Sequence, residues 1–273
     1  MSRVREALLR AGGRFEAETA DPAVGRDGSA NNLLAQVPVV PYRLSPDAAL
    51  TPVDSHETPI EEFRALRTRL NHMQSRQPIR TLLVTSPSPA EGKSFAVLNL
   101  ALAQAQLSGH RVLLCDFDFR RPVIHKIFQM DRGPGLTDYL LGKIPPASAM
   151  RRIGDANLYI MPAGEAVMNP LELLNLPQVK QLLARVSSAF NWVLLDSPPL
   201  LYAADANLLA TMCDATLLVV RIGATTIDSI ARAQQTLCHD NVIGIVVNGA
   251  HRGELYGKYP HYASYNVQGS EDS

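Results

Sequence analysis

The sequence of 273 residues predicts an α/β fold, in which a doubly wound and mainly parallel sheet is flanked by helices. Short apolar runs alternate along the chain with longer segments whose apolar residues recur at helical spacing. Two of the runs end in an aspartate, Asp116 and Asp196, and a third ends in a Ser/Pro-rich turn. Alternation of this kind favours parallel strands joined by right-handed crossovers.

The composition excludes several classes of function. The 26 basic residues balance the 26 acidic residues, so no positive excess indicates binding to nucleic acid or to a membrane surface. The three cysteines show no C-x-x-C spacing, which is typical of a reducing compartment. No apolar run approaches the roughly 18 residues of a membrane span. We therefore expect a cytoplasmic chain that does not itself enter a membrane.

The chain begins with a segment of weak pattern. Residues 1–54 contain Gly, Ala, Pro, Asp and Asn without sustained periodicity, which predicts a mobile arm. Within it, Val4–Leu9 is compatible with a short helix and VPVVPYRL with a short edge segment. The arm precedes a globular domain over 55–250 and a disordered, tyrosine-rich tail over 251–273.

A helix is expected at 59–73, where PIEEFRALRTRLNHM begins with proline and carries acids in its first turn. Its apolar stripe consists of Ile60, Phe63, Leu66 and Leu70. Glu61, Arg64 and Arg67 stand three residues apart and share one side of this helix. Spacing alone allows either a solvated face with an ion pair or an interface.

A phosphate loop is expected in the stretch TLLVTSPSPAEGKSF. A strand at 81–84 precedes it and a helix at 95–107 follows, which is the order in which G-K-[ST] binds phosphate. Backbone N–H groups would face the anion, Lys93 would reach the β and γ phosphates, and Ser94 would bind magnesium. A strict motif has glycine at the position of Pro87, so the loop alone does not establish a nucleotide site.

Two aspartates follow the next predicted strand, at 111–115. The run RVLLC leads directly into DFDFRRP, which places Asp116 and Asp118 at the carboxyl end of a buried strand. That end of an open α/β sheet adjoins the crevice where ligands bind. As an alternative, the two aspartates could be turn residues or a helix cap.

A third aspartate, Asp196, ends the apolar run 192–195 in NWVLLDSPP. A carboxylate at this place can hold the hydration shell of a magnesium ion bound by Ser94. Asp196 is thus the acidic partner that the phosphate loop requires. The remaining expected elements are a short helix in PGLTDYLLG, a strand at 157–161, helices at 179–189, 204–212 and 226–239, and strands at 215–221 and 242–248.

The tail is polar and ends in acidic residues, yet it holds four of the chain's eight tyrosines. They follow at a spacing of three residues: Tyr256, Tyr259, Tyr262 and Tyr265. The cluster is either an aromatic patch that docks on the body or on a partner, or a set of phosphate acceptors.

Together these segments resemble the bacterial tyrosine kinases of capsular and exopolysaccharide biosynthesis, which have a P-loop NTPase fold with Walker A, A-prime and B motifs. The resemblance rests on the S-x-x-P-A-E-G-K-S loop, the L-L-C-D-F-D-F-R-R-P segment, the V-L-L-D-S-P-P segment and the terminal tyrosines, in that order. It spans roughly 57–265 and includes GLTDYLLG, PAGEAVMNPLELL and GIVVN. It implies an ATP-dependent protein-tyrosine kinase that phosphorylates its own tail and regulates polysaccharide synthesis and export.

The resemblance also assigns roles to single residues. Lys93 would bind phosphate, Asp116 would accept the proton of the incoming tyrosine, and Ser94, Asp118 and Asp196 would hold Mg²⁺. The residues that would contact ATP are Ser88, Pro89, Ala90, Glu91, Gly92, Lys93, Ser94, Phe95 and Asn248. The tail tyrosines would be the phosphoacceptors.

The same resemblance implies partners. Members assemble head to tail through an E-x-x-R-x-x-R helix, which Glu61, Arg64 and Arg67 reproduce, so a homo-oligomeric ring is expected. A membrane-embedded polysaccharide co-polymerase would activate the kinase and hold it at the inner membrane, and a cognate tyrosine phosphatase would oppose it. One departure is that Ala90 stands where the family usually has glycine. If that position requires a positive φ, Ala90 is strained by roughly 1 kcal/mol or more.

Two other functions are compatible with the sequence. The first is a switch ATPase related to the partition and septum-positioning proteins, which share the deviant loop and the fold. Those proteins carry a characteristic lysine where this chain has Ser88, and often a terminal amphipathic helix that this chain lacks. The second is a nucleotide-bound scaffold weakened at Ala90. Tyrosine phosphorylation of the tail in ATP and Mg²⁺ would distinguish the kinase from both.

Overall fold

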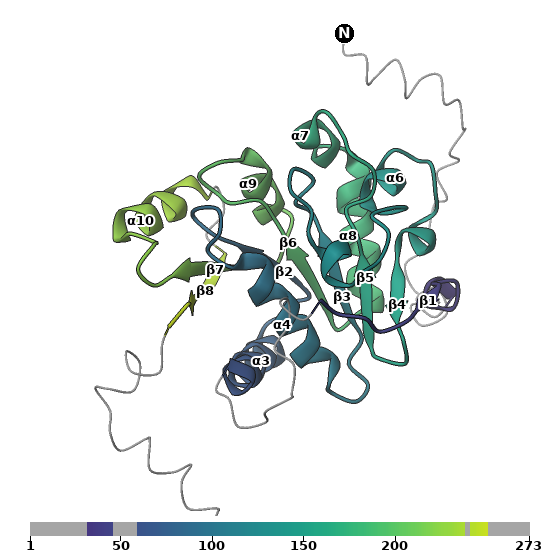
Figure 1. The fold of residues 1–273 in the computed structure, drawn as a ribbon, viewed down its shortest axis with the longest axis horizontal. Coiled ribbons are helices and arrows are strands. Elements are labelled where there is room, and N and C mark those ends of the chain that lie inside the picture. The colour runs from purple at the N-terminus through teal and green to yellow at the C-terminus, as the bar shows by residue number, and fades with distance from the viewer. Residues whose placement is uncertain (1–31, 46–58, 238–240, 251–273) are drawn as a thin grey trace, which may run out of the picture.

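The computed structural model describes residues 32–45, 59–237 and 241–250, and its strands form one sheet (Figure 1). The strands are β1 (Val39–Val40), β2 (Thr81–Thr85), β3 (Val112–Asp116), β4 (Arg151–Ile153), β5 (Leu158–Met161), β6 (Trp192–Asp196), β7 (Ala215–Arg221) and β8 (Val242–Asn248). Their order across the sheet is β1-β4-β5-β3-β6-β2-β7-β8. All neighbours are parallel except β4 and β5, which are antiparallel. The predicted doubly wound α/β fold is confirmed.

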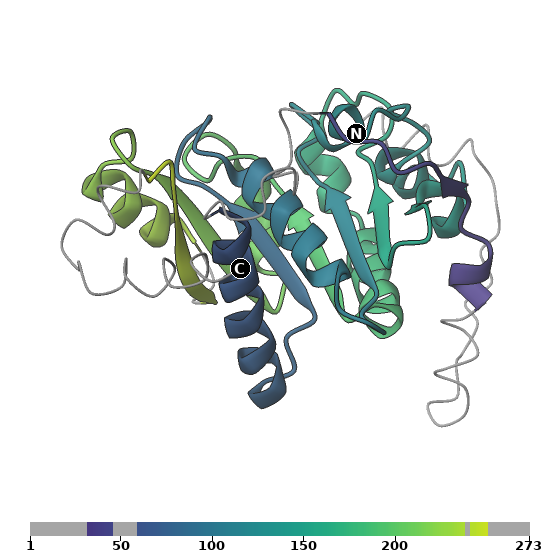
Figure 2. The same ribbon diagram turned by 60° about the horizontal axis from the view of Figure 1, so that its bottom comes forward.

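Helices cover both faces of this sheet. They are α3 (Pro59–Arg76), α4 (Lys93–Ala105), α5 (Ile124–Ile127), α6 (Leu136–Leu140), α7 (Pro170–Leu174), α8 (Pro177–Ala189), α9 (Ala204–Ala210) and α10 (Ile227–Thr236), with a 3-10 turn η2 (Pro146–Ala149). The blue helices α3 and α4 lie side by side across one face (Figure 2). Their apolar residues share one core with the sheet, whereas α6 and α8 pack in a second core on the opposite face.

Strand β2 shows why the central strands are apolar throughout. Leu82 and Val84 pack in the core on the side of α3 and α4, whereas Leu83 packs in the opposite core. Successive side chains of a strand point to opposite faces, so a strand that is covered on both faces requires a continuous apolar run. The polar residues that follow such a strand therefore lie at its end, where the helices leave the sheet open.

The central strands bring their polar ends together. In the register of the parallel pair β3 and β6, Asp116 lies opposite Asp196. Asp196 is in turn paired with Val84 of β2, one residue before the end of that strand. The loops that follow these strands therefore meet at one edge of the sheet, at the top of Figure 1.

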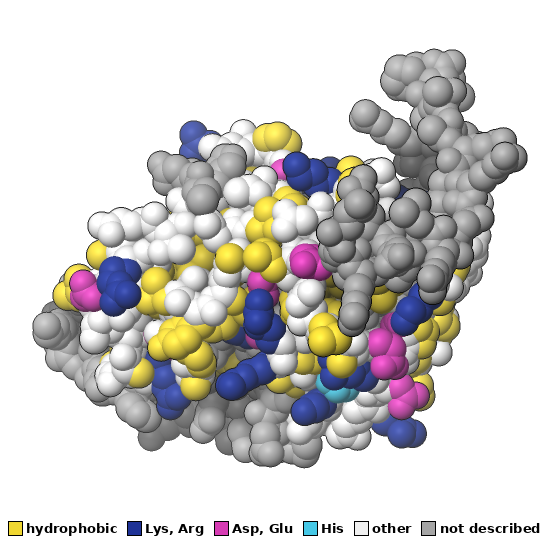
Figure 3. All heavy atoms as spheres, turned by 90° about the horizontal axis from the view of Figure 1, so that it is seen from above, with side chains coloured by type: hydrophobic (Ala, Val, Ile, Leu, Met, Phe, Trp, Pro, Cys, Tyr) yellow, Lys and Arg dark blue, Asp and Glu magenta, His cyan; other side chains and the backbone are white. Residues whose placement is uncertain are grey.

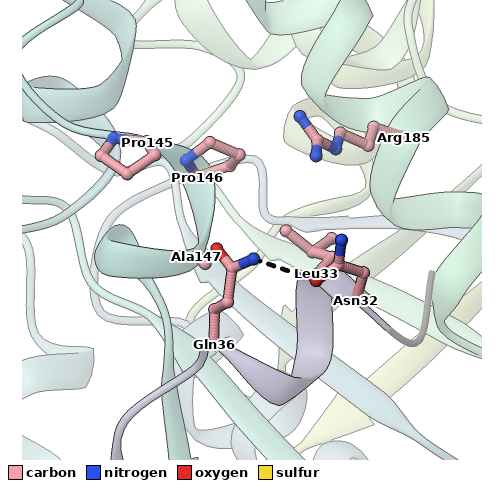
Figure 4. Close-up of a pocket in the computed structure, with 7 residues that line it drawn as sticks. All are labelled: Asn32, Leu33, Gln36, Pro145, Pro146, Ala147 and Arg185. Atoms are coloured by element: carbon pink, nitrogen blue, oxygen red, sulfur yellow. Dashed lines mark hydrogen bonds between the residues drawn. The ribbon is translucent and has the colours of Figure 1, made fainter. Parts of the chain in front are cut away.

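Part of the predicted mobile arm is instead packed on the body. Leu33 and Val37 are buried in the core on the α6 and α8 side, and β1 pairs in parallel with β4 at the edge of the sheet. A small pocket lies between this segment and the body, and Gln36 donates to Asn32 on the segment's side of it (Figure 4). Its lining residues are Asn32, Leu33, Gln36, Pro145, Pro146, Ala147 and Arg185, none of which belongs to the phosphate loop. Residues 1–31 and 46–54 of the arm lie outside the described residues.

The expected helices and strands are present, with ends that differ by a few residues. Two strands have no counterpart among the strands expected in the domain: β4, which lies between β1 and β5 and is antiparallel to β5, and the edge strand β1, which VPVVPYRL only allowed. Among the helices of the described residues, none combines the length and apolar character that crossing a membrane requires.

Candidate nucleotide and phosphoryl-transfer site

The phosphate loop connects β2 to α4 and ends on Gly92, which caps the helix with φ of 93°. Within the described chain no side chain caps this helix end, so its first backbone N–H groups remain directed away from the helix. Helix N-termini of this kind bind anions through these groups and through the helix dipole. The local structure is therefore suited to a phosphate.

Gly92 is required here for a second reason. A Cβ atom at this position would lie 1.9 Å from Nδ2 of Asn248, which is closer than any real contact. Asn248 ends β8 and donates from Nδ2 to the carbonyl oxygen of Glu91, at 3.0 Å. The end of the last strand is thus packed against the phosphate loop, which places Asn248 beside the predicted nucleotide site.

Glu91 anchors the loop from inside the protein. Its side chain is buried, and Oε2 accepts a hydrogen bond from the backbone N–H of Ser88, at 2.7 Å. Its other oxygen, Oε1, accepts from the hydroxyl of Thr225, which follows β7. Thr225 Oγ1 also accepts from the backbone N–H of Arg221, at 2.8 Å. The shape of the loop is therefore fixed by residues at the ends of β7 and β8.

Ala90 adopts the left-handed conformation, with φ of 61°. Strain at Ala90 was expected if this position has a positive φ, and that condition is met. For a residue with a Cβ atom this conformation costs about 1 to 2 kcal/mol. The guanidinium of Arg221 donates to the carbonyl oxygen of Ala90, at 3.2 Å, and helps to hold this strained turn.

Replacing Ala90 by glycine is expected to relieve this strain. We expect the Ala90→Gly variant to bind ATP more tightly and to phosphorylate its tail faster, by up to about tenfold if 1.4 kcal/mol of strain is released on forming the binding loop. Fluorescent-nucleotide titration and initial rates of tail phosphorylation measure both. Gly109→Ala is the matched control, because Gly109 has φ of 74° and its added Cβ would meet no described atom within 4 Å. Unchanged nucleotide affinity and rate in Ala90→Gly would show that Ala90 does not weaken the loop.

Lys93 stands at the centre of a buried charged cluster. Its Nζ lies 3.0 Å from Oδ2 of Asp118, 3.5 Å from Oδ1 of Asp196 and 3.2 Å from the hydroxyl of Ser94. Ser94 in turn donates to Oδ2 of Asp196, at 2.6 Å. These four side chains come from α4 and from the ends of β3 and β6. The structure therefore brings together the predicted phosphate lysine and the three predicted magnesium ligands.

Burial and charge act against one another in this cluster. Burial would lower the pKa of Lys93, but attraction to Asp196 and then to Asp118 outweighs it and raises that pKa. Burial raises the pKa of Asp196, although Lys93 and the hydrogen bond from Ser94 both favour its ionised form. Lys93 thus remains charged, and it is the cation that pairs with both carboxylates.

Asp116 is fully buried beneath the same edge. Its Oδ2 accepts from the backbone N–H groups of Val123 and Ile124, both at 3.0 Å, and its Oδ1 accepts from that of Asp118, at 3.2 Å. Burial, followed by repulsion from Asp196, raises the pKa of Asp116 to about 8, against the opposing effect of the Ile124 N–H. Asp116 therefore shapes the turn that carries Asp118, as the alternative of a turn or helix-cap role anticipated, and it is also poised to exchange a proton near neutral pH.

The sequence DFDF explains why the two aspartates point to the same side. Phe117 and Phe119 are buried in the core that contains α6 and α8, with ring centroids 5.8 Å apart. The aromatic and acidic residues alternate, so Asp116 and Asp118 are not on the side of the two rings, and the N–H of Asp118 bonds back to Oδ1 of Asp116 in the turn. The backbone N–H of Arg121 donates to Oδ1 of Asp118, at 3.0 Å, which leaves Oδ2 facing Lys93.

The donor set fits a magnesium ion. Ser94, Asp118 and Asp196 all offer oxygen ligands, which Mg²⁺ prefers, and one or two carboxylates commonly suffice because phosphate and water supply the rest. Both carboxylates of the set, Asp118 and Asp196, already face a single positive charge, the ammonium of Lys93. Seen from above in Figure 3, basic and acidic side chains adjoin near the middle of this face of the molecule.

The charged residues predicted to form the interface, on α3, make contacts within this chain. Arg64 forms an ion pair with Glu61 on the exposed side of α3. The guanidinium of Arg67 donates to the carbonyl oxygen of Ala103 in α4, at 2.8 Å, and so holds α3 on α4 within the chain. The ion pair is the one that the solvated-face interpretation anticipated, and an interface role for these residues stays a prediction.

The tail tyrosines Tyr256, Tyr259, Tyr262 and Tyr265 lie outside the described residues. Conversely, the sequence analysis did not single out Arg221, Thr225, Arg120 or Asp205, all of which connect loops at this edge. Arg221 ends a predicted strand, Arg120 and Thr225 lie in the loops that follow predicted strands, and Asp205 lies in the first turn of a predicted helix. These positions are the only signal in the sequence that could have indicated them.

Comparison with known proteins gives a consistent result. No family model matches the chain. The tyrosine-protein kinase YwqD of Bacillus subtilis (strain 168) is 32% identical over 215 residues, which cover 78% of this chain and 87% of YwqD. The putative tyrosine-protein kinase EpsB of Ralstonia solanacearum is 36% identical over 215 residues, which cover 76% of this chain but only 28% of EpsB. The tyrosine-protein kinase Wzc of Salmonella typhimurium is 32% identical over 217 residues, which cover 78% of this chain and 30% of Wzc.

Solved structures give the same grouping. The kinase domain of the Escherichia coli tyrosine kinase ETK superposes with a TM-score of 0.72 at 30% identity, over 77% of this chain and 83% of that domain. The BceF tyrosine kinase domain superposes with a TM-score of 0.67 at 31% identity, over 81% of this chain and 86% of that domain. The cell division ATPase MinD of Pyrococcus furiosus shares the fold, with a TM-score of 0.54 at 19% identity, over 64% of this chain and 75% of MinD.

Proposed function

This chain belongs to the bacterial tyrosine-protein kinase family, and from that premise we propose that it is an ATP-dependent kinase that phosphorylates the tyrosines of its own C-terminal tail. The observation that carries the proposal is the convergence of Lys93, Ser94, Asp118 and Asp196 at the end of a phosphate loop. The MinD likeness concerns the fold alone and does not favour a switch ATPase.

In the proposed reaction a tail tyrosine oxygen attacks the γ phosphorus of ATP, and the bond from that phosphorus to the oxygen bridging it to the β phosphate breaks. Lys93 leaves Asp118 and Asp196 to bind the β and γ phosphates, and the N–H groups at the start of α4 hold the same phosphates. Bound Mg²⁺, held by Ser94, Asp118 and Asp196, would offset the negative charge that develops on the phosphate oxygens.

Asp116 receives the proton of the tyrosine hydroxyl in this proposal. In its ionised form, which predominates above about pH 8, the Asp116 carboxylate offers about four acceptor positions. Backbone N–H groups use three of them, so one remains for the phenol. A phenol with a pKa near 10 is closer in acidity to a carboxyl with a raised pKa than to an ordinary one near 4. The transfer is late, because the transition state of phosphoryl transfer is loose.

The extended tail is long enough to reach the site of a neighbouring molecule. A tail that begins at Gly249 could span about 80 Å when extended, at about 3.3 Å per residue. We propose transfer in trans within a homo-oligomeric ring, with Glu61, Arg64 and Arg67 at the contact. A membrane-embedded polysaccharide co-polymerase would bring the chain to the inner membrane, a tyrosine phosphatase would reverse the modification, and the cycle would regulate exopolysaccharide or capsule export.

Incubation of the purified full chain with ATP and Mg²⁺, followed by phosphosite mapping by mass spectrometry, tests this function. We expect phosphate on Tyr256, Tyr259, Tyr262 and Tyr265, and a loss of at least nine-tenths of the label when all four are replaced by phenylalanine. ATP hydrolysis without tyrosine label would identify a switch ATPase instead. Nucleotide binding with neither reaction would identify a scaffold.

A further inference from the structure

Arg120 and Asp205 form a forked ion pair between the loops that follow β3 and β6. Nε of Arg120 lies 2.7 Å from Oδ2 of Asp205, and Nη2 lies 3.2 Å from Oδ1. Two parallel contacts of this kind fix both direction and distance, which a lysine cannot do. The Asp205 side chain is 2% exposed, whereas that of Arg120 is 48% exposed.

The pair joins the two loops that carry the candidate magnesium carboxylates. Arg120 lies two residues after Asp118, in the loop that follows β3. Asp205 lies in the first turn of α9, at the end of the loop that begins at Asp196. Figure 1 shows α9 standing beside the end of β6 on the same edge of the sheet.

The backbone around Arg120 is held on both sides. Phe119 is buried in the core, and the N–H of Arg121 is donated to Asp118. The two contacts of Arg120 with Asp205 are a third restraint, located between Phe119 and Arg121 in the chain. This restraint alone of the three connects the turn to the loop that follows β6. A shift of this turn would therefore move Asp118 relative to Asp196.

A buried carboxylate requires a partner, so neutralisation of Asp205 alone could account for an arginine at this place. Neutralisation alone requires neither two parallel contacts nor an arginine from the turn that holds Asp118. Arg120 lies between two other restraints on that turn, and its two contacts with Asp205 connect the turn to the loop that follows β6. This arrangement indicates that Arg120 sets the distance between the two loops.

We propose that Arg120 and Asp205 are positioning residues that fix Asp118 relative to Asp196 for binding of a divalent cation with ATP. This inference rests on the proposed function, because it takes Asp118 and Asp196 as the metal carboxylates. Loss of a residue that orients a metal ligand commonly lowers metal affinity by about 10- to 100-fold.

The test measures Mn²⁺ binding directly, by electron paramagnetic resonance of free Mn²⁺, in the full chain saturated with a non-hydrolysable ATP analogue. We expect Arg120→Ala and Asp205→Asn to raise the Mn²⁺ dissociation constant at least tenfold. Arg120→Lys keeps the charge without the fork and should lie between these variants and the wild type. Nucleotide affinity measured in EDTA should change by less than threefold in all of them.

Arg232→Ala is the matched control, since Arg232 forms an arginine–aspartate pair with Asp228 on α10, with Nη1 and Oδ2 3.8 Å apart. Its Mn²⁺ affinity should equal that of the wild type. If Arg120→Ala is not folded by circular dichroism, Arg120→Lys and Asp205→Asn decide the question. Mn²⁺ affinity within twofold of the wild type in the folded variants overturns the proposal. Phosphosite mapping of the wild type is read separately, so failure of the kinase function remains distinguishable from failure of this inference.

Discussion

Replacing Lys93 by methionine is expected to abolish phosphorylation by the altered chain while leaving its tail a substrate for a neighbour. The ammonium of Lys93 is the only group of the cluster that can move from the carboxylates to the phosphates of ATP. Removing one preorganised donor to the developing charge typically costs about 10²- to 10³-fold in rate. Phosphate on the isolated Lys93→Met chain should therefore fall by at least that factor.

A mixture of two defective chains tests whether transfer occurs between molecules. The Lys93→Met chain supplies a tail without an active site, and a chain ending at residue 250 supplies an active site without tyrosines of the tail. We expect mass spectrometry to find phosphate on the Lys93→Met tail in the mixture. A tail that stays unlabelled beside an active truncated chain would contradict transfer in trans.

The loss of Lys93 also leaves Asp118 and Asp196 without their cation, so stability needs its own control. A buried carboxylate that loses its partner commonly destabilises a protein by about 3 to 5 kcal/mol. Lys143→Met removes a lysine that pairs with Asp138 at 3.4 Å, outside the site. This variant should keep its labelling rate, and thermal unfolding of both variants separates loss of folding from loss of chemistry.

The arrangement of the site could be predicted from the sequence because it follows from rules of parallel sheets. Each apolar run that ends in a polar residue became a strand, and the register pairs Asp116 with Asp196. Parallel strands place their carboxyl ends at one edge, so residues far apart in the chain meet there. The alternation of acids and aromatic rings in DFDF then sets the side to which the acids point.

Other features depend on tertiary contacts that no local pattern encodes. The strand β4 pairs in antiparallel fashion over only two residue pairs, and β1 exists because the segment around Leu33 and Val37 finds a place on the core. The contacts of Glu91 with Thr225, and of Arg120 with Asp205, join loops that are 85 or more residues apart. Spacing rules reach one helix turn or one strand neighbour, so they could not identify these pairs.

Replacing Asp116 by asparagine is expected to lower the rate of tail phosphorylation by about 10²- to 10⁴-fold, the usual contribution of a positioned acid or base. An amide has a similar shape but cannot take up the proton of the tyrosine. It also has a single acceptor oxygen, so at least one of the N–H groups of Asp118, Val123 and Ile124 loses its partner. Initial rates at saturating ATP and Mg²⁺ measure the effect. Asp138→Asn is the control, because Asp138 is also buried and accepts a backbone N–H, that of Gly135 at 3.0 Å, away from the site.

The raised pKa of Asp116 makes a second readout possible in the ligand-free protein. An unfolded aspartate has a pKa near 4, whereas burial raises the pKa of Asp116 in the folded protein to about 8. Its protonated form therefore favours the folded state, and this contribution is complete below about pH 4 and is lost as the pH rises toward 8. Asparagine cannot ionise, so the free energy of unfolding of the wild type should fall relative to that of Asp116→Asn between pH 5.5 and 8.5. Urea unfolding of both proteins at these two pH values measures this difference. A constant difference, together with an unchanged phosphorylation rate, would mean that Asp116 is neither buried with a raised pKa nor the proton acceptor.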